Sequence, residues 1–145
     1  MVAAAYTVLT VLFLPMSYGP IQVRISEALT VLPYVAPFSI WGLGLGCMLA
    51  NIFGGYGIYD IVFGSLATLG AGFLTRMMPS PYLAPVPPVI INALVVGAYL
   101  SILTDFPLVA AVLYVGLGEA LACFGLGLPL LLFILRRQKI LNFLR

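Results

Sequence analysis

The chain has 145 residues, of which 63% are hydrophobic and 7% charged, and its mean hydropathy is +1.21. These values exclude an ordinary soluble domain and indicate a membrane protein. The six basic residues also exclude a nucleic-acid-binding protein, which needs a strongly basic surface. Because a helical span needs roughly 20 apolar residues, this length predicts about six spans in one membrane domain, residues 1–145.

Prolines, glycines and isolated charges divide the apolar sequence into spans. The first break is the turn sequence beginning at Ser17, and Pro33 and Pro37 end the second span because proline cannot donate a helical hydrogen bond. The sequence predicts an all-α bundle of six transmembrane helices, at about 2–17, 22–36, 39–55, 58–77, 87–104 and 108–135.

The orientation of the bundle follows from its cations, because arginine and lysine in short loops accumulate on the cytoplasmic side. Four basic residues follow the last span, namely Arg136, Arg137, Lys139 and Arg145. Counting back through six spans predicts that both termini and Arg76 are cytoplasmic, with Asp60 and Asp105 near the outside. Arg24 then falls at the outer end of the second span, where this tendency does not place a cation.

Small residues recur every four positions in the third span. Gly42, Gly46, Ala50 and Gly54 lie on one helix face, where another backbone can approach closely. This pattern predicts tight helix packing rather than a ligand site.

The residues of catalytic and metal sites are missing. The chain has no histidine, and Cys47 and Cys123 are far apart in sequence, so neither an imidazole base nor a zinc motif is available. A phosphate-binding loop is also absent, so any ATP hydrolysis requires a partner. We therefore expect no enzyme activity, cofactor or metal.

Charges at membrane depth are costly, so those inside the predicted spans are candidate binding residues. Glu119 lies roughly 16 Å along the sixth span, with no cation within reach on its own helix. It is either a ligand carboxylate or a structural carboxyl, held neutral or paired with Arg24. Arg24 and Glu27 are three residues apart, which favours either a local ion pair or a polar entrance.

Three further polar residues complete the candidates. Asn51 and Asn92 carry amides that could bridge helices or bind a ligand. Asp60 opens the fourth span, where capping of the helix and ligand binding are both open alternatives. We interpret Asp105, in a turn before Phe106-Pro107, as solvated.

Residues 18–29, YGPIQVRISEAL, resemble the signature of the QueT family, and so do DIVFGSLATL at 60–69, PPVIIN at 87–92 and GEA at 118–120. These proteins are S components of energy-coupling factor (ECF) transporters associated with queuosine precursors. The resemblance implies a six-helix subunit in the cell membrane that works with a T component and two cytoplasmic ATPases. It also implies a contact between the T component and a small-residue pair on the first helix, here Ala3 and Thr7.

The ligand implied by the resemblance is a 7-deazaguanine such as preQ1, or queuine. A carboxylate at Glu119 can accept a bidentate pair of hydrogen bonds from a guanine-like edge. The base could stack on Tyr99, Tyr114, Trp41 or Phe63. We also expect the outer loop from Tyr18 to Gln22 to close over the ligand. The alternatives are an S component for another vitamin and a small membrane enzyme.

Overall fold

The computed structural model describes residues 1–18, 23–54 and 56–144, and every regular element in these ranges is helical. The elements are, in chain order, α1 (Val2–Leu12), α2 (Leu14–Ser17), η1 (Ile25–Tyr34), α3 (Ser39–Phe53), α4 (Gly57–Tyr59), η2 (Asp60–Gly64), α5 (Ser65–Arg76), η3 (Pro81–Leu83), α6 (Val86–Thr104), α7 (Leu108–Ala120), η4 (Leu121–Gly127), α8 (Leu128–Arg136) and α9 (Gln138–Leu144). The all-α prediction is therefore confirmed for the described ranges.

Three continuous helical stretches are long and apolar enough to cross a membrane, namely Gly57–Arg76, Pro81–Thr104 and Leu108–Arg136. They contain 20, 24 and 29 residues and agree with the last three predicted spans. Two further apolar helices, Val2–Leu12 and Ser39–Phe53, fall short of that length. The described residues thus confirm three helices of spanning length and leave a six-span bundle as a prediction.

The second predicted span, 22–36, differs most from expectation. Its described part contains η1, a 3₁₀ helix of ten residues with Pro33 inside it. At about 2.0 Å per residue, η1 is roughly 20 Å long, which is less than the roughly 30 Å hydrocarbon core of a bilayer. The helical segment continues past Pro33 to Tyr34, and it is a 3₁₀ helix instead of the regular α-helix expected.

Close approaches between backbones hold the helices together, as the glycine spacing predicts. A Cβ atom added at Gly46 of α3 would lie 2.8 Å from the carbonyl oxygen of Ala3 in α1. A Cβ at Gly97 of α6 would lie 2.8 Å from the Cα of Val112 in α7. These contacts leave no room for a larger residue, so the small residues are required for helix packing.

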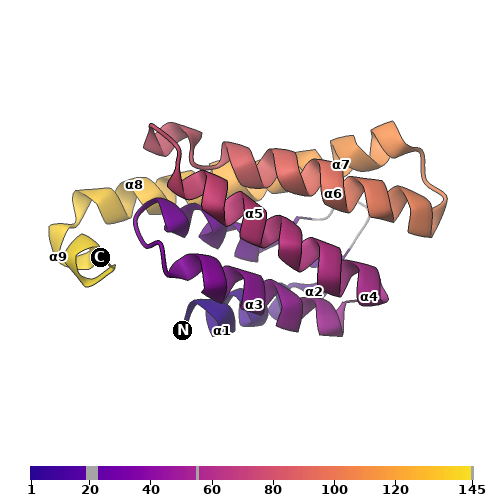
Figure 1. Cartoon of the computed structure of the whole chain (residues 1–145), viewed down its shortest axis with the longest axis horizontal. Helices are drawn as coiled ribbons and strands as arrows, with labels where there is room; N and C mark the ends of the chain where they lie inside the picture. Colours follow the sequence, from indigo (N-terminus) through magenta and orange to yellow (C-terminus); the bar gives the residue numbers. More distant parts are fainter. Residues whose placement is uncertain (19–22, 55, 145) are drawn as a thin grey trace.

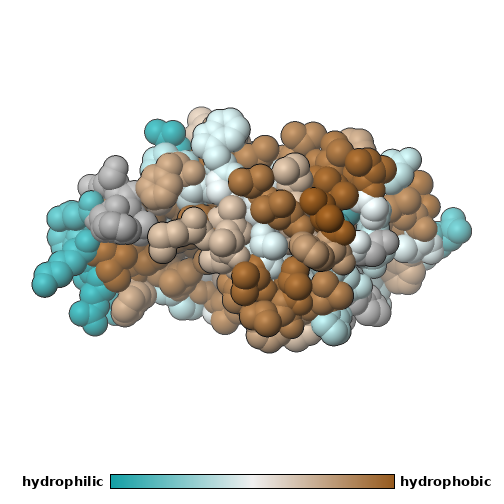
Figure 2. Space-filling model, turned by 90° about the horizontal axis from the view of Figure 1, so that it is seen from below, coloured by the Kyte–Doolittle hydropathy of each residue, from teal (hydrophilic) through white to brown (hydrophobic). Residues whose placement is uncertain are grey.

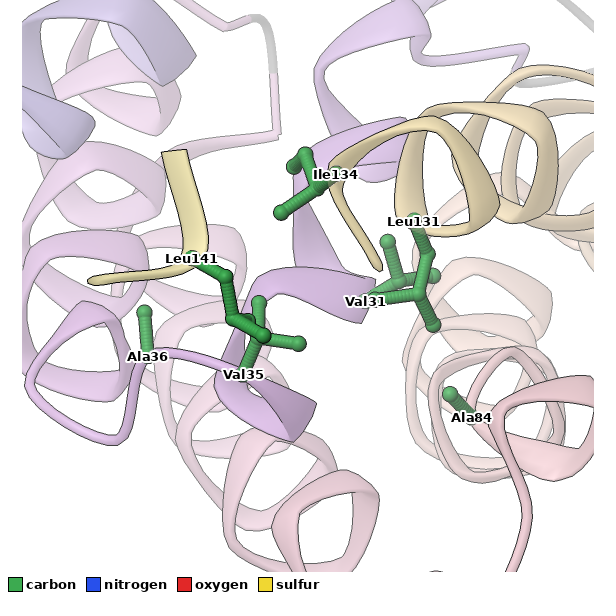
Figure 3. Close-up of a cluster of buried hydrophobic side chains, with 7 residues drawn as sticks. All are labelled: Val31, Val35, Ala36, Ala84, Leu131, Ile134 and Leu141. Carbon is green, nitrogen blue, oxygen red and sulfur yellow. The ribbon is translucent and has the colours of Figure 1, made fainter. Parts of the chain in front are cut away.

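On the face seen in Figure 2, hydrophobic residues dominate the middle of the molecule, and hydrophilic residues gather at its left end. Many large hydrophobic side chains, such as Trp41 and Ile102, are exposed, which suits contact with lipid. Met1 and α9 lie toward the same end of the long axis (Figure 1). At that end, Leu141 of α9 packs with Val35, which directly follows η1, and with Ile134 of α8 (Figure 3).

Candidate functional site

Four charged side chains are buried among the described residues, and all other described charges are exposed. The buried ones are Arg24, Glu27, Asp60 and Glu119, each at most 4% exposed. One cation and three carboxylates are an unbalanced set for an apolar bundle, where each unpaired charge costs several kcal/mol. They fall into two clusters with different hydrogen bonding.

The first group, which we call the Arg24 cluster, consists of Tyr18, Arg24, Asn51, Asp60 and Tyr99. The guanidinium Nη2 of Arg24 lies 3.3 Å from both carboxylate oxygens of Asp60. Arg24 Nη1 donates to Asn51 Oδ1 at 3.2 Å, and Nε donates to the carbonyl of Ser17 at 3.3 Å. Among the described residues, Arg24 is the only buried cation; it is neutralised by Asp60, and its donors contact α2, α3 and η2.

Tyrosine hydroxyls complete this cluster. The Tyr99 hydroxyl in α6 donates to Asp60 Oδ1. Tyr18 donates to Asn51 Oδ1 at 3.0 Å, and its ring centroid lies 4.8 Å from the Arg24 guanidinium carbon, within cation–π range. Asn51 Nδ2 in turn donates to the backbone carbonyl of Asp60 at 2.7 Å. The side chains of this cluster thus satisfy one another.

The second group, the Glu27–Glu119 cluster, consists of Tyr6, Glu27, Asn92, Glu119 and Cys123. The Tyr6 hydroxyl in α1 donates to Glu27 Oε1. Glu27 Oε2 and Asn92 Oδ1 are buried, and neither has a hydrogen-bond partner within the described part of the chain. Buried polar atoms in folded proteins are nearly always hydrogen-bonded, so two such acceptors in one cluster make it a candidate site for donors from a ligand.

Cys123 connects the two glutamates of this cluster. Its sulfur lies 3.4 Å from the backbone oxygen of Glu27 and 3.8 Å from Glu119 Oε2. The Asn92 amide lies beside the Glu119 carboxylate. The Asn92 amide and the weakly donating Cys123 thiol leave further lone pairs of the Glu119 carboxylate able to accept hydrogen bonds. Residues from η1, α6, α7 and η4 therefore surround one acidic site.

Two π-helical turns bring the acidic side chains into place. Asp60 is the first residue of η2, and Glu119 lies in the last turn of α7, two residues before η4 begins at Leu121. Both turns end in a glycine with a close neighbour: an added Cβ would lie 2.9 Å from Asn51 Nδ2 at Gly64 and 2.9 Å from the Ala28 carbonyl at Gly127. π turns are rare and are frequent at functional sites. They allow η2 and η4 to reach α3 and η1.

The structure changes two interpretations of the charged residues and agrees with a third. Arg24 and Glu27 do not form the predicted local ion pair, because Arg24 contacts Asp60 and Glu27 contacts Tyr6. The Asp60 side chain makes no helix cap, since it is occupied by Arg24 and Tyr99. Asp105 is exposed at the end of α6, in a left-handed conformation with φ 52°, as expected for a turn residue.

Of the four aromatic residues considered for stacking, only Tyr99 is buried. Trp41, Phe63 and Tyr114 are 66%, 47% and 39% exposed and form pairs with other aromatic residues on the surface. Sequence reasoning missed Tyr6, Tyr18 and Cys123 as members of the clusters. Tyr18 begins the signature segment and could have been suspected for that reason, but no sequence pattern pointed to Tyr6.

The remaining predicted contacts lie on α1 and in the loop after α2. Ala3 and Thr7 are partly exposed, and the Thr7 hydroxyl donates to the carbonyl of Gly46 at 3.0 Å. The loop expected to close over a ligand includes residues 19–22, which lie outside the described residues.

Ionisable side chains inside an apolar helix bundle are typical of substrate and ion pathways, so the fold and the two clusters define a membrane protein of the transport class. The sequence profile of the QueT transporter family matches residues 1–136. The chain therefore belongs to the QueT transporter family, which confirms the expectation of a transport protein rather than an enzyme.

The chain is similar to the queuosine precursor transporter QueT of Lactococcus lactis subsp. cremoris (strain MG1363). The two are 39% identical over 70 residues, which cover 47% of this chain and 41% of the relative. The aligned segment thus spans less than half of the relative's length. No solved structure gives a significant match.

Proposed function

We propose that this chain is the substrate-binding S component of an ECF importer for a queuosine precursor. The ligand is a 7-deazaguanine such as preQ1, or queuine, and the Glu27–Glu119 cluster is its binding site. The observation that carries this proposal is the pair of unpartnered buried acceptors, Glu27 Oε2 and Asn92 Oδ1, beside the carboxylate of Glu119. A guanine-like edge offers the adjacent N–H donors that such a site lacks.

Arg24, Asn51 and Asp60 have a different role in this proposal. Their polar atoms are largely engaged with one another, so they position η1 and η2 around the site instead of contacting the ligand. Tyr99 and Tyr18 then serve the same purpose. The six residues predicted as a binding set thus divide into three that bind and three that hold the site in shape.

The proposed mechanism requires partners. With both termini cytoplasmic, the ligand enters from outside and is delivered through a T component, while two cytoplasmic ATPases supply the energy. Contact with the T component is proposed at Ala3 and Thr7, whose small side chains are partly exposed on α1. Transport must then stop when the ATPases are inactivated, while binding to this chain persists. Uptake by this chain alone in liposomes would contradict the arrangement.

The binding role is tested by equilibrium binding of labelled preQ1 and queuine to the purified protein. We expect Glu119→Gln to weaken binding strongly. Asp105→Asn is the matched control, because it also removes one carboxylate charge but lies on the surface. Equal affinities for the parent and Glu119→Gln would remove the proposed site. If the protein binds a different vitamin tightly and neither preQ1 nor queuine, it is an S component for that vitamin instead.

A further inference from the structure

The last apolar stretch of the chain ends in a group of cations. Arg136 is the final residue of α8, Arg137 follows it directly, and Lys139 lies in α9. All three side chains are exposed. None of them forms a salt bridge within the described ranges, where the one ion pair joins Arg24 and Asp60. Three neighbouring positive charges therefore have no counterion in the described part of the protein.

The acidic residues of the chain are placed where they cannot supply that counterion. Three of the four are buried in the two clusters inside the bundle, namely Glu27, Asp60 and Glu119. The fourth, Asp105, follows the last residue of α6, whereas Ala84, shortly before the first, packs in one cluster with Leu131 of α8. The 19 residues of α6 separate these ends by roughly 28 Å. This distance exceeds the Debye length of about 8–10 Å, so Asp105 does not neutralise the three cations.

The cations meet at one surface pocket because the chain changes direction between α8 and α9. Arg137 has φ −109° and ψ 88°, which lies outside the helical region and ends α8. Leu141 of α9 then packs with Ile134 of α8 in the buried cluster of Figure 3, which holds α9 against the bundle. The resulting pocket of about 550 Å³ is lined by Phe133, Arg136, Arg137, Gln138, Lys139 and Ile140.

The pocket lining combines positive charge with an apolar wall. Phe133 and Ile140 are 51% and 37% exposed. The guanidinium carbon of Arg137 lies 5.4 Å from the ring centroid of Phe133, within cation–π range, so this cation is held beside the apolar surface. The Gln138 side chain is engaged elsewhere, since its Nε2 donates to Asn142 Oδ1 at 3.1 Å. An anion with an attached hydrocarbon group fits this combination.

The pocket also lies at the level where such molecules occur in a bilayer. The helical stretch Leu108–Arg136 has 29 residues and is roughly 43 Å long, which exceeds the roughly 30 Å hydrocarbon core. One end of this stretch therefore reaches the headgroup region. Hydrophilic residues gather at the left end of the face in Figure 2, which is the end where α9 lies in Figure 1.

We propose that the pocket between α8 and α9 binds an anionic phospholipid. The lipid phosphate lies among Arg136, Arg137 and Lys139, and the first part of an acyl chain covers Phe133 and Ile140. A free phosphate would use the cations alone, so the exposed apolar wall favours the lipid. The orientation proposed above places the pocket in the cytoplasmic leaflet, where anionic lipids are concentrated. This site is separate from the Glu27–Glu119 cluster and does not depend on which ligand is transported.

The experiment measures binding of phosphatidylglycerol and phosphatidylcholine to the detergent-solubilised full chain by native mass spectrometry. We expect the parent to bind phosphatidylglycerol about tenfold more tightly or better, because several basic residues act together on one headgroup. The triple variant Arg136→Gln, Arg137→Gln and Lys139→Gln should lose most of this preference. Arg137→Gln alone should lose part of it. Arg76→Gln is the matched control, because Arg76 is an exposed cation at the end of α5 and does not line the pocket.

The melting temperature of each variant without added lipid reports whether it is folded. Equal affinities of the parent for the two lipids overturn the proposal, and so does an unchanged preference in the folded triple variant. Equal losses for Arg137→Gln and Arg76→Gln show a general effect of surface charge and overturn the assignment to this pocket. An excess of inorganic phosphate is the last arm. If it displaces phosphatidylglycerol and raises the melting temperature as much as the lipid does, the site binds free phosphate and the lipid assignment is wrong.

Discussion

The two buried polar clusters differ in how completely they are satisfied. The Arg24 cluster contains one cation and one carboxylate, and hydrogen bonds link its side chains to four helical elements. The Glu27–Glu119 cluster contains two carboxylates, no cation, and two acceptors without partners in the described chain. A cluster that is balanced in the absence of ligand stabilises the fold, whereas an unbalanced one is suited to binding. Substitutions should therefore act in opposite directions at the two sites.

The largest effect is expected at Asp60. Asp60→Leu leaves Arg24 buried and unpaired, which should destabilise the fold by about 3–5 kcal/mol. Thermal unfolding of the detergent-solubilised protein measures this loss. The double variant Arg24→Met with Asp60→Leu is the control, because it removes both charges and should recover much of the stability. Wild-type stability of the single variant would show that the ion pair does not hold the fold.

The second effect is expected at Glu119 and has the opposite sign. Glu119→Gln removes an uncompensated charge, so stability without ligand should stay the same or rise. Ligand affinity should fall by about 10- to 100-fold, since hydrogen bonds to charged groups contribute roughly 1.5–3 kcal/mol. A ligand-dependent thermal shift reports both quantities, because a ligand that binds the folded state raises its apparent stability. If Glu119→Gln strongly destabilised the ligand-free protein, Glu119 would stabilise the fold as Asp60 does, and the proposed difference between the two clusters would be wrong.

Gly64→Ala probes the close packing around the Arg24 cluster. The added Cβ would lie 2.9 Å from Asn51 Nδ2 and 3.1 Å from Asp60 Oδ1, so we expect destabilisation of roughly 1–3 kcal/mol. Gly70→Ala on α5 is a matched control, because no atom lies within 4 Å of its added Cβ. That control should be neutral or stabilising by up to about 1 kcal/mol, since alanine favours a helix over glycine. Equal unfolding temperatures for the two variants would count against tight packing at Gly64.

The smallest effect concerns a single hydroxyl group. Tyr99→Phe removes the donor to Asp60 and should cost about 1 kcal/mol of stability. Tyr114→Phe serves as the control, because Tyr114 is 39% exposed and stacks with Phe106 on the surface. Chemical denaturation measures both changes. A larger loss for Tyr114 than for Tyr99 would contradict the role of the buried hydroxyl.

Hydrophobic patterning predicted the long helices of this fold well. The spans at 58–77, 87–104 and 108–135 match helical stretches to within a few residues at most positions, because an apolar run interrupted only by turn residues has few alternatives in lipid. The 3₁₀ conformation of η1 was not predictable in the same way. Its backbone depends on packing, such as the contact of Gly127 with Ala28, which no local pattern encodes.

The buried charged residues of the candidate site could be predicted as a set, but their arrangement could not. Burial of charge in an apolar sequence identified Arg24, Glu27, Asp60 and Glu119. Helical spacing then suggested a pair between Arg24 and Glu27, whereas the partner of Arg24 is 36 positions away in sequence. Helical spacing relates only residues on the same helix, so it could not show that Arg24 and Glu27 belong to different clusters. The two π turns that set the arrangement carry no clear sequence signal either.

The most direct test is a structure of the protein with a bound 7-deazaguanine. We predict ligand N–H groups at hydrogen-bond distance, about 2.7–3.2 Å, from Glu27 Oε2, Asn92 Oδ1 and the Glu119 carboxylate, with the Arg24–Asp60 pair intact. A ligand bound against Arg24 and Asp60, with Glu27 Oε2 and Asn92 Oδ1 still without partners, would contradict it.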